Sequence, residues 1–472
     1  MLLLCVNKEK FMKWKTKEDL LQYARVLEGH SIKEANKINQ ANNSFPISNA
    51  KPLYSGKGGF GDFLEEKYFG KANDTASQPD FDELGVELKS VPLRTNNDGS
   101  VRVKERIVLN KFRFKDIVNE TFETSHFLKK DAILLFVFYF HNNQLAMEDK
   151  RIDLVDLWEV LKHDANQIRA DWEFIVNKIK EGKAHELSEG DTLYLGACTK
   201  GSTRQESMQS QPFSDIMAPG RALCFKVSYA NMIYKILLQT KSQRKEILAS
   251  SIYDEKEEWM PLEERVHQLV DRYAGMTGEE ISSLFQKPFS LKNKSRYANI
   301  ARYMLGFSTK EKQYYEFEAA NIQVKSIRIE TNNSVKEAMS FKNVPYVDIV
   351  SQDWEDSDFY NELTSKFIFM FFKKCEFGED YSFDGFSLWN MPLADLEKAH
   401  EVWERTKQKV AEGQYEGFPS ITQSSVAHVR PKAKDSSDLM LTPQESYEKK
   451  KCFWLNNKYI RDEIVQKHLD EC

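Results

Sequence analysis

The feature that most constrains the fold is an internal repeat, because six sequence patterns of the first half recur in the same order in the second half. The paired stretches are 17–38 with 262–285, 60–70 with 297–306, 80–91 with 316–327, 123–127 with 355–359, 171–182 with 402–413, and 224–233 with 452–461. One such pair alone would mean little, but chance rarely preserves the order of six. The repeat indicates a tandem duplication of one unit of about 210–240 residues, which is within the usual size of a domain.

Each copy predicts a mixed α/β unit. The first stretch of each copy shows an amphipathic helix, a glycine turn, a Ser or Thr helix cap and a second helix. The longest apolar runs, residues 132–140 and 367–372, are far shorter than the ~20 residues of a membrane span and are typical of buried central strands. We expect two tandem domains, residues 1–240 and 260–472, joined by a polar, charged linker at 241–259.

Composition narrows the class of protein. The 472 residues are 41% hydrophobic and carry a formal net charge of −5, which fits folded domains and argues against a histone-like basic protein. A nucleic-acid partner would need a locally basic face. The six cysteines form no CxxC pair, and the N-terminal apolar run is too short for a signal peptide, so we expect a cytoplasmic protein without a membrane partner.

A short acidic stretch carries the candidate chemistry, in a loose PD…ExK pattern. Residues 85–91 have strand character, and period-two alternation places Glu87 and Lys89 on one face. Asp80 precedes Glu87 by seven residues, and Glu65 lies on the predicted helix before it. An amphipathic edge strand with a charged face is the commoner interpretation of such a pattern, and a metal site with its own cation is the alternative.

The second copy bears on this choice, because two acids of the first copy are replaced there by a neutral amide and a cation. The corresponding pairs are Asp80 and Glu316, Glu87 and Gln323, Lys89 and Lys325, and Glu65 and Arg302. If the acids were only part of a solvent-exposed face, their loss in the second copy would have no functional significance. If they hold a divalent metal, the second copy has lost both its metal and its chemistry.

The carboxylates of Asp80 and Glu87 suit a hard divalent cation such as Mg²⁺, which keeps several waters and binds phosphate oxygens. Such an ion could bridge to a scissile phosphate and activate a water as the nucleophile. Lys89 could orient or help deprotonate that water and stabilise the charged transition state. Glu65 could add an outer carboxylate. The hypothesis is metal-dependent hydrolysis of a phosphodiester in the first half.

The chain strongly resembles MutH, the GATC-specific nicking endonuclease of mismatch repair, in the stretches "KGGFGDFLEEKYFG", "QPDFDELGVELKSVPL", "FETSHFLKK" and "DWEFIVNKIKEGKAHEL". It resembles still more closely the type II restriction endonucleases that carry two MutH-like halves and cut at GATC. The resemblance implies two restriction-endonuclease folds, each a mixed central sheet flanked by helices, and Mg²⁺-dependent hydrolysis of DNA, by analogy 5′ of the guanine. It places the family's acids and active-site lysines on Glu65, Asp80, Glu87, Lys89 and Lys130. His126, in the same motif as Lys130, is interpreted as structural.

The expected basic face lies at residues 196–245, which hold eight Lys/Arg against two Asp/Glu. By resemblance, Lys200 stands where MutH presents a base-reading lysine, and lysine suits guanine O6 and N7 in the major groove; a solvated turn lysine is the alternative. The other candidates are phosphate contacts at Arg204, Arg221 and Lys226, and a groove contact or core position at Tyr229.

The second half keeps the stretch "HVRPKAKDS" at 428–436, which resembles the corresponding MutH loop in its Arg-Pro-Lys triplet. Arg430 and Lys432 are therefore candidate base readers in a half that cannot cut. In the restriction family this half is an effector-DNA domain, so we expect it to bind GATC without cleavage.

The leading hypothesis is a type II restriction endonuclease that cuts both strands at GATC. A MutH-like nickase of mismatch repair is the first rival, and the duplication argues against it because that family works with a single copy. A non-enzymatic DNA-binding protein is the second rival, and the intact first-half acids argue against it. A monomer in solution and a dimer on DNA are both compatible with the sequence.

Overall fold

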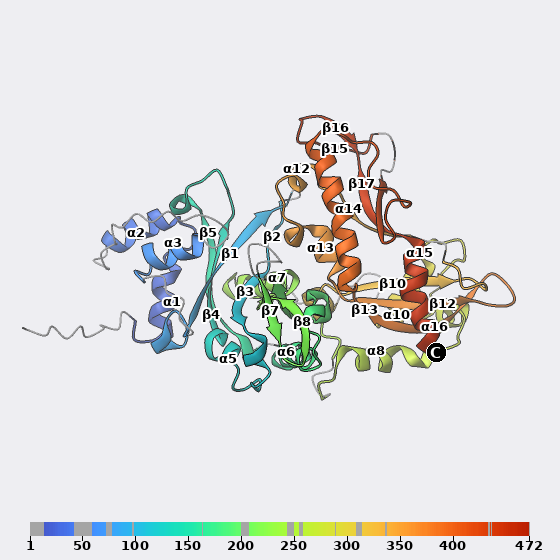
Figure 1. Ribbon diagram of the computed structural model, residues 1–472, viewed down its shortest axis with the longest axis horizontal. Helices are drawn as coiled ribbons and strands as arrows, with labels where there is room; N and C mark the ends of the chain where they lie inside the picture. The colour runs from blue at the N-terminus through green and yellow to red at the C-terminus, as the bar shows by residue number, and fades with distance from the viewer. Residues whose placement is uncertain are drawn as a thin grey trace, which may run out of the picture. The chain divides into compact units, whose positions relative to one another are not determined.

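The computed structural model describes residues 14–41, 59–71, 78–96, 99–162, 164–199, 207–242, 250–253, 258–287, 289–307, 314–335, 338–432, 435 and 437–471 (Figure 1). Two compact units make up the chain. Unit 1 comprises Met1–Ala165, Ala222–Cys224 and Ile233–Arg244, and unit 2 comprises Asn166–Arg221, Phe225–Met232 and Lys245–Cys472. None of the described helices is long and apolar enough to cross a membrane.

Unit 1 is built on a four-stranded mixed sheet in the order β2-β1-β4-β5. β1 (Glu87–Thr95) runs parallel to β4 (Ile133–Phe140) and antiparallel to β2 (Val101–Val103), and β5 (Ile152–Glu159) runs antiparallel to β4. Six of the eight residues of β4 are buried, which confirms the prediction of a central strand.

The helices at the start of unit 1 cover this sheet with their apolar faces. α1 begins after a reciprocal capping box, in which the Thr16 hydroxyl accepts from Asp19 N and the Asp19 carboxylate accepts from Thr16 N. Leu20 of α1, Leu64 of α3 and Leu135 of β4 are fully buried in one shared core cluster. The described α-helices of this region are α1 (Lys17–Arg25), α2 (Ile32–Ala41), α3 (Gly59–Lys67), α4 (Phe114–Ile117) and α5 (His126–Asp131), and its remaining strand is β3 (Ile107–Phe112).

The remaining elements of the first copy are α6 (Ala165–Lys180), β6 (Leu195–Thr199), β7 (Met208–Gln211), β8 (Ser214–Pro219), β9 (Arg221–Phe225) and α7 (Val227–Ser242). β7 and β8 form an antiparallel hairpin. β6 ends at Thr199, directly before the candidate base reader Lys200.

The second copy repeats this order within unit 2. β10 (Gln323–Ile329) is parallel to β12 (Phe367–Lys374), which is antiparallel to β13 (Tyr381–Trp389). The other elements are α8 (Leu262–Val270), α9 (Gly278–Leu284), α10 (Arg296–Met304), α11 (Tyr315–Ala319), β11 (Met339–Asn343), α12 (Tyr346–Ile349), α13 (Asp358–Leu363), α14 (Leu393–Ala411), β14 (Ala427–Pro431), β15 (Leu439–Leu441), β16 (Tyr447–Lys449), β17 (Lys451–Leu455), α15 (Asn457–Tyr459), a π-helix (Ile460–Val465) and α16 (Gln466–Glu471).

The strand registers of the two copies agree. Glu87 opens β1 opposite Leu134 near the start of β4, and Gln323 opens β10 opposite Phe367 at the start of β12. β4 and β12 each have a register shift against the following antiparallel strand. The structure therefore confirms the predicted fold class, two copies of a mixed sheet flanked by helices.

The division into compact units differs from the predicted domain boundaries. Residues 166–221 and 225–232 belong to the first copy but pack within unit 2. Lys226 Nζ donates to the carbonyl oxygen of Thr364 at 3.1 Å, and the Tyr360 hydroxyl donates to Glu189 Oε1 at 3.0 Å. These contacts form a polar seam between the two copies inside unit 2. The boundaries at 240 and 260, which rest on the repeat, stay a prediction.

Candidate active site

A tight turn before β1 brings Asp80 and Glu87 together. A 3-10 helix (Asp82–Leu84) and Gly85 reverse the chain, and Gly85 has φ 63°, a left-handed conformation that residues with a Cβ adopt at a cost. Asp80 N then donates to Glu87 Oε2 at 3.0 Å, and Leu88 N donates to Asp80 Oδ2 at 2.9 Å. The turn thus places two acids that are seven residues apart in direct contact.

Two lysines lie against the Glu87 carboxylate. Lys89 Nζ is 2.9 Å from Glu87 Oε1, which confirms that the two residues share a strand face, and Lys130 Nζ is 3.6 Å from the same oxygen. Only 6% of the Glu87 side chain is exposed. Burial raises the pKa of Glu87, the Lys89 ammonium opposes that shift, and the Asp80 carboxylate adds to it.

The structure adds Asp131, which the sequence reasoning missed. Asp131 ends α5, its side chain is fully buried, and its Oδ1 lies 3.5 Å from Lys89 Nζ. Burial acts to lower the pKa of Lys89, but Asp131 and Glu87 outweigh it and raise the pKa. The signal in the sequence was the acid directly after the Lys-Lys pair of the motif. We assign Asp131 as a positioning residue that keeps the Lys89 ammonium charged.

Replacing Asp131 by Asn should slow cleavage about 10- to 100-fold, the usual cost of losing a group that orients an active-site residue. Because the pKa of Lys89 would fall without this partner, the variant should lose activity as the pH rises into the alkaline range where the wild type still cuts. The measurement is the pH–rate profile on GATC DNA. A variant whose profile matches the wild type at every pH would show that Asp131 does not act through Lys89.

Glu65 lies on α3 and interacts electrostatically with the acids of the cluster. Burial, together with the charges of Asp80, Asp62 and Glu87 and against that of Lys71, raises the pKa of Glu65 to about 7. Carboxylates that repel one another in this way form the donor set that a divalent cation stabilises. In the described part of the chain no three His, Cys, Asp or Glu side chains lie close enough together to hold a metal. The carboxylate groups therefore suit a hard cation in their chemistry. In this structure, however, the carboxylate oxygens of Asp80 and Glu87 contact main-chain N–H groups and lysine ammonium groups.

The second copy lacks this arrangement. Glu316, the counterpart of Asp80, accepts from Ser251 Oγ at 2.5 Å and from Ile252 N at 2.9 Å, so its carboxylate is held by another segment. Arg302, the counterpart of Glu65, lies over the Phe307 ring at 5.1 Å. Among the residues that the structure describes, these contacts and the neutral amide of Gln323 leave no acidic cluster around β10.

Several predicted DNA contacts are placed differently from the expectation. Lys200 and Arg204 lie outside the described residues. Arg221 is 5% exposed and donates to the carbonyl oxygens of Ala197 at 3.1 Å and Leu187 at 2.5 Å. A buried guanidinium that already binds main-chain oxygens cannot also reach a phosphate on the surface, which corrects the expectation for Arg221.

Lys226 and Tyr229 are also interior groups. Lys226 is 6% exposed, and its ammonium donates to the carbonyl oxygens of Thr192 and Thr364. Tyr229 is fully buried and stacks on Tyr194 with ring centroids 4.6 Å apart. The phosphate assignment of Lys226 is therefore corrected in the same way, and of the two alternatives for Tyr229 the structure supports the core.

Arg221 should consequently matter for stability. Replacement by Ala leaves two buried carbonyl groups without their donor, so it should lower the free energy of unfolding by about 2–4 kcal/mol. Chemical denaturation measures this effect. Arg461→Ala is the control, because Arg461 is half exposed and its ion pair is with its neighbour Asp462. A stable Arg221→Ala protein with uniformly weaker DNA binding would restore the phosphate assignment.

The candidate readers of the second half lie at an exposed strand end. Arg430 is exposed, and its guanidinium stacks 3.7 Å from the centroid of the Trp454 ring. Lys432, one residue past β14, donates to the carbonyl oxygen of Phe341 at 3.0 Å. In the first half, His126 opens α5, and its main-chain N–H donates to Glu120 Oε2 at 3.0 Å.

The fold and the acidic cluster define a nuclease built from two related halves, and comparison with known proteins agrees. The model of the family "DNA mismatch repair enzyme MutH" matches two segments, residues 69–171 and 305–400. The chain is 29% identical to the type II restriction enzyme Sau3AI of Staphylococcus aureus over 467 residues, which cover 89% of this chain and 94% of that enzyme.

Similarity to MutH itself is confined to part of the chain. The MutH protein of Vibrio parahaemolyticus is 28% identical over 165 residues, 34% of this chain and 71% of that protein. The MutH protein of Salmonella paratyphi A is 28% identical over 178 residues, 37% of this chain and 72% of that protein. These similarities support a MutH-like type II restriction endonuclease, that is, a site-specific deoxyribonuclease.

Proposed function

We propose that the chain cuts both strands of double-stranded DNA at GATC, 5′ of the guanine, in a Mg²⁺-dependent reaction. The first half would cut, and the second half would bind GATC as an effector without cutting. One observation carries the proposal: the chain holds Asp80, Glu87 and Lys89 in contact in the first half. Likeness to a type II enzyme along most of the chain supports cutting of both strands.

Asp80 and Glu87 are the residues that would hold the ion, with Glu65 as an outer carboxylate. When bound, Mg²⁺ would act as a Lewis acid on the phosphate and lower the pKa of a water. Each acid would first have to exchange a main-chain N–H or an ammonium for the ion, since these donors occupy their oxygens.

Lys89 would act as a charge and not as a base. Its raised pKa keeps the ammonium protonated at neutral pH, so it can donate to a phosphate oxygen and stabilise negative charge in the transition state. Lys130, beside the same Glu87 oxygen, would help to keep that carboxylate ionised. Of the two roles that the sequence left open for Lys89, deprotonation of the water and stabilisation of the transition state, we therefore propose the second.

Incubation of supercoiled plasmid carrying unmethylated GATC with the protein and Mg²⁺ tests the proposal. Linear fragments with ends 5′ of the guanine are expected, and a chelator should abolish them. Nicked circles alone would support the MutH-like nickase, and unchanged plasmid would support a non-enzymatic DNA-binding protein.

A further inference from the structure

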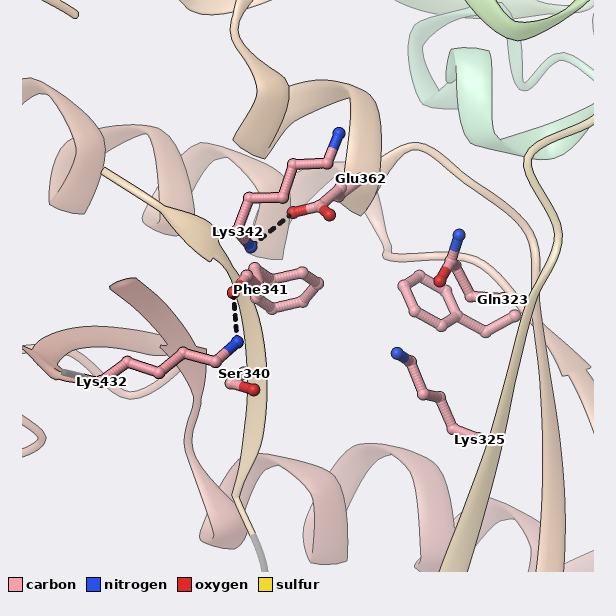
Figure 2. Close-up of a pocket in the computed structure, with 8 residues that line it drawn as sticks. Gln323, Lys325, Ser340, Phe341, Lys342, Glu362 and Lys432 are labelled. Atoms are coloured by element: carbon pink, nitrogen blue, oxygen red, sulfur yellow. Dashed lines mark hydrogen bonds between the residues drawn. The ribbon is translucent and has the colours of Figure 1, made fainter. Parts of the chain in front are cut away.

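The second half has a pocket where the first half has its acidic cluster. The pocket has a volume of about 250 Å³, and the polar side chains that line it include those of Gln323, Lys325, Ser340, Lys342, Glu362 and Lys432 (Figure 2). This volume is below the roughly 300–1,000 Å³ of sites for drug-sized ligands, so it suits one small group and its waters.

Three of the pocket residues occupy positions equivalent to those of candidate active-site residues in the first half. Gln323 and Lys325 are the first and third residues of β10, as Glu87 and Lys89 are of β1. The helices beside them are also equivalent, because each is capped by a serine hydroxyl that accepts from the N–H three residues on. Counted from these caps, Ser125 and Ser357, Glu362 takes the place of Lys130 and Leu363 that of Asp131.

The charge of the site is reversed between the copies. The first-half cluster combines four carboxylates, those of Glu65, Asp80, Glu87 and Asp131, with the two ammonium groups of Lys89 and Lys130. The second-half pocket combines the ammonium groups of Lys325 and Lys432 with the single carboxylate of Glu362, and the side chain of the lining residue Lys342 extends away from the two other lysines (Figure 2). A site with this excess of positive charge repels a divalent cation and attracts an anion.

Lys325 is left without the partners that hold Lys89. Its ammonium makes no hydrogen bond or ion pair with any residue in the described part of the chain, because the positions of Glu87 and Asp131 now hold Gln323 and Leu363. Burial, the largest cause, lowers the pKa of Lys325, the Glu362 carboxylate opposes that shift, and the nearby Lys432 adds to it. Figure 2 shows the side chains of Lys325 and Lys432 reaching toward each other from opposite walls of the pocket. An anion between them would satisfy both ammonium groups.

We propose that this pocket binds a phosphate group of the DNA backbone without a metal ion. The proposal rests on the proposed function, in which the second half binds DNA, and it names the chemistry by which that half holds DNA. The second copy of the site would then have retained the ability to bind a phosphodiester after it lost the ability to bind a metal ion. Lysine contacts to phosphates position DNA and carry no sequence information, so Lys432 would bind a phosphate in place of a base, and base reading would remain with Arg430.

Lysine acetylation read by mass spectrometry can test the pocket in the full-length chain. The protein carries Glu87→Gln and is kept in a chelator, so that DNA stays intact. It is labelled alone, with a GATC duplex, or with inorganic phosphate. We expect the duplex to protect both Lys325 and Lys432 and to leave Lys467, an exposed lysine on α16, unprotected. Duplex protection of Lys432 and of the exposed Lys449, but not of Lys325, would overturn the phosphate pocket while the DNA-binding role of this half stands.

Two other outcomes would also overturn the proposal. Protection of no second-half lysine by the duplex would remove the DNA-binding role and the pocket together. Protection of Lys325 by inorganic phosphate but not by the duplex would show a free anion as the ligand in place of the DNA backbone.

Two variants of the pocket are expected to change the affinity for the duplex in opposite directions. The duplex concentration that half-protects Lys432 should rise about tenfold in Lys325→Gln, because one charge-assisted hydrogen bond is lost. It should fall in Glu362→Gln, which removes the one negative charge of the pocket yet keeps an oxygen to accept from Lys342 N. Lys467→Gln should change nothing. A shift in the same direction for Lys325→Gln and Glu362→Gln would overturn the electrostatic argument.

Discussion

Replacing Glu87 by Gln is expected to slow GATC cleavage by more than a hundredfold, because loss of a direct metal ligand should cost more than the roughly 10- to 100-fold of an outer partner. The chain has made the same change in its second copy, where Gln323 stands at this register. Lys89→Ala should cost about 10²–10³ in rate, as loss of one transition-state donor does. Single-turnover cleavage with excess enzyme measures both effects.

The binding of DNA in a chelator and the thermal unfolding temperature should stay near wild type in the Glu87→Gln protein, since Gln keeps the shape of the side chain. Lys129→Ala is the matched control, because Lys129 neighbours Lys130 on α5 but is exposed. A Glu87→Gln enzyme that cuts at near wild-type rate would remove Glu87 from the active site. Equal losses in the Lys129→Ala enzyme would show that the assay reports on helix α5 in general.

A plasmid with two GATC sites should be cut faster per site than a plasmid with one, if GATC in the second half favours the cutting-competent state of the first. Couplings between sites typically amount to about 1–3 kcal/mol, or roughly 5- to 150-fold. A short GATC duplex should accelerate cutting of the one-site plasmid until it competes for the catalytic half. Initial rates over a range of duplex concentrations would show this rise and fall.

The polar seam inside unit 2 would give such a coupling a physical route. The hydroxyl of Thr199, the residue before the candidate base reader Lys200, donates to Glu355 Oε1 at 2.5 Å. Glu355 lies two residues before the Ser357 cap of α13, the helix that carries the pocket residue Glu362. A ligand that shifts α13 would therefore act on the segment that leads into residue 200.

The double variant Arg430→Ala, Lys432→Ala should lose the stimulation, and Lys467→Ala should keep it. Cutting of the one-site plasmid without added duplex is the reference rate for each protein. Equal rates per site on both plasmids, with a short duplex that only inhibits, would show that the second half is not an effector domain. Intact protein is needed for these measurements, because residues 166–221 of the first copy pack with the second half.

Much of the fold and of the acidic site follows from local sequence patterns. The repeat of six stretches predicted two related α/β copies, and the apolar runs predicted β4 and β12, because strands buried on both faces need continuous apolar side chains. Alternation along β1 predicted that Glu87 and Lys89 share a face, and their ion pair at 2.9 Å confirms it. These features depend on residues that are close together in the chain, so they can be read from the sequence alone.

Other features depend on which segments fold against one another. A basic stretch in the sequence predicted surface contacts at Arg221 and Lys226, but tertiary packing buries both against main-chain carbonyl groups. Composition cannot distinguish a lysine or arginine that faces DNA from one that satisfies buried carbonyls, since both need the same donor groups. Packing alone also placed the buried Asp131 against Lys89 and, in the other copy, placed Lys325 in a pocket that Gln323 and Lys432 also line.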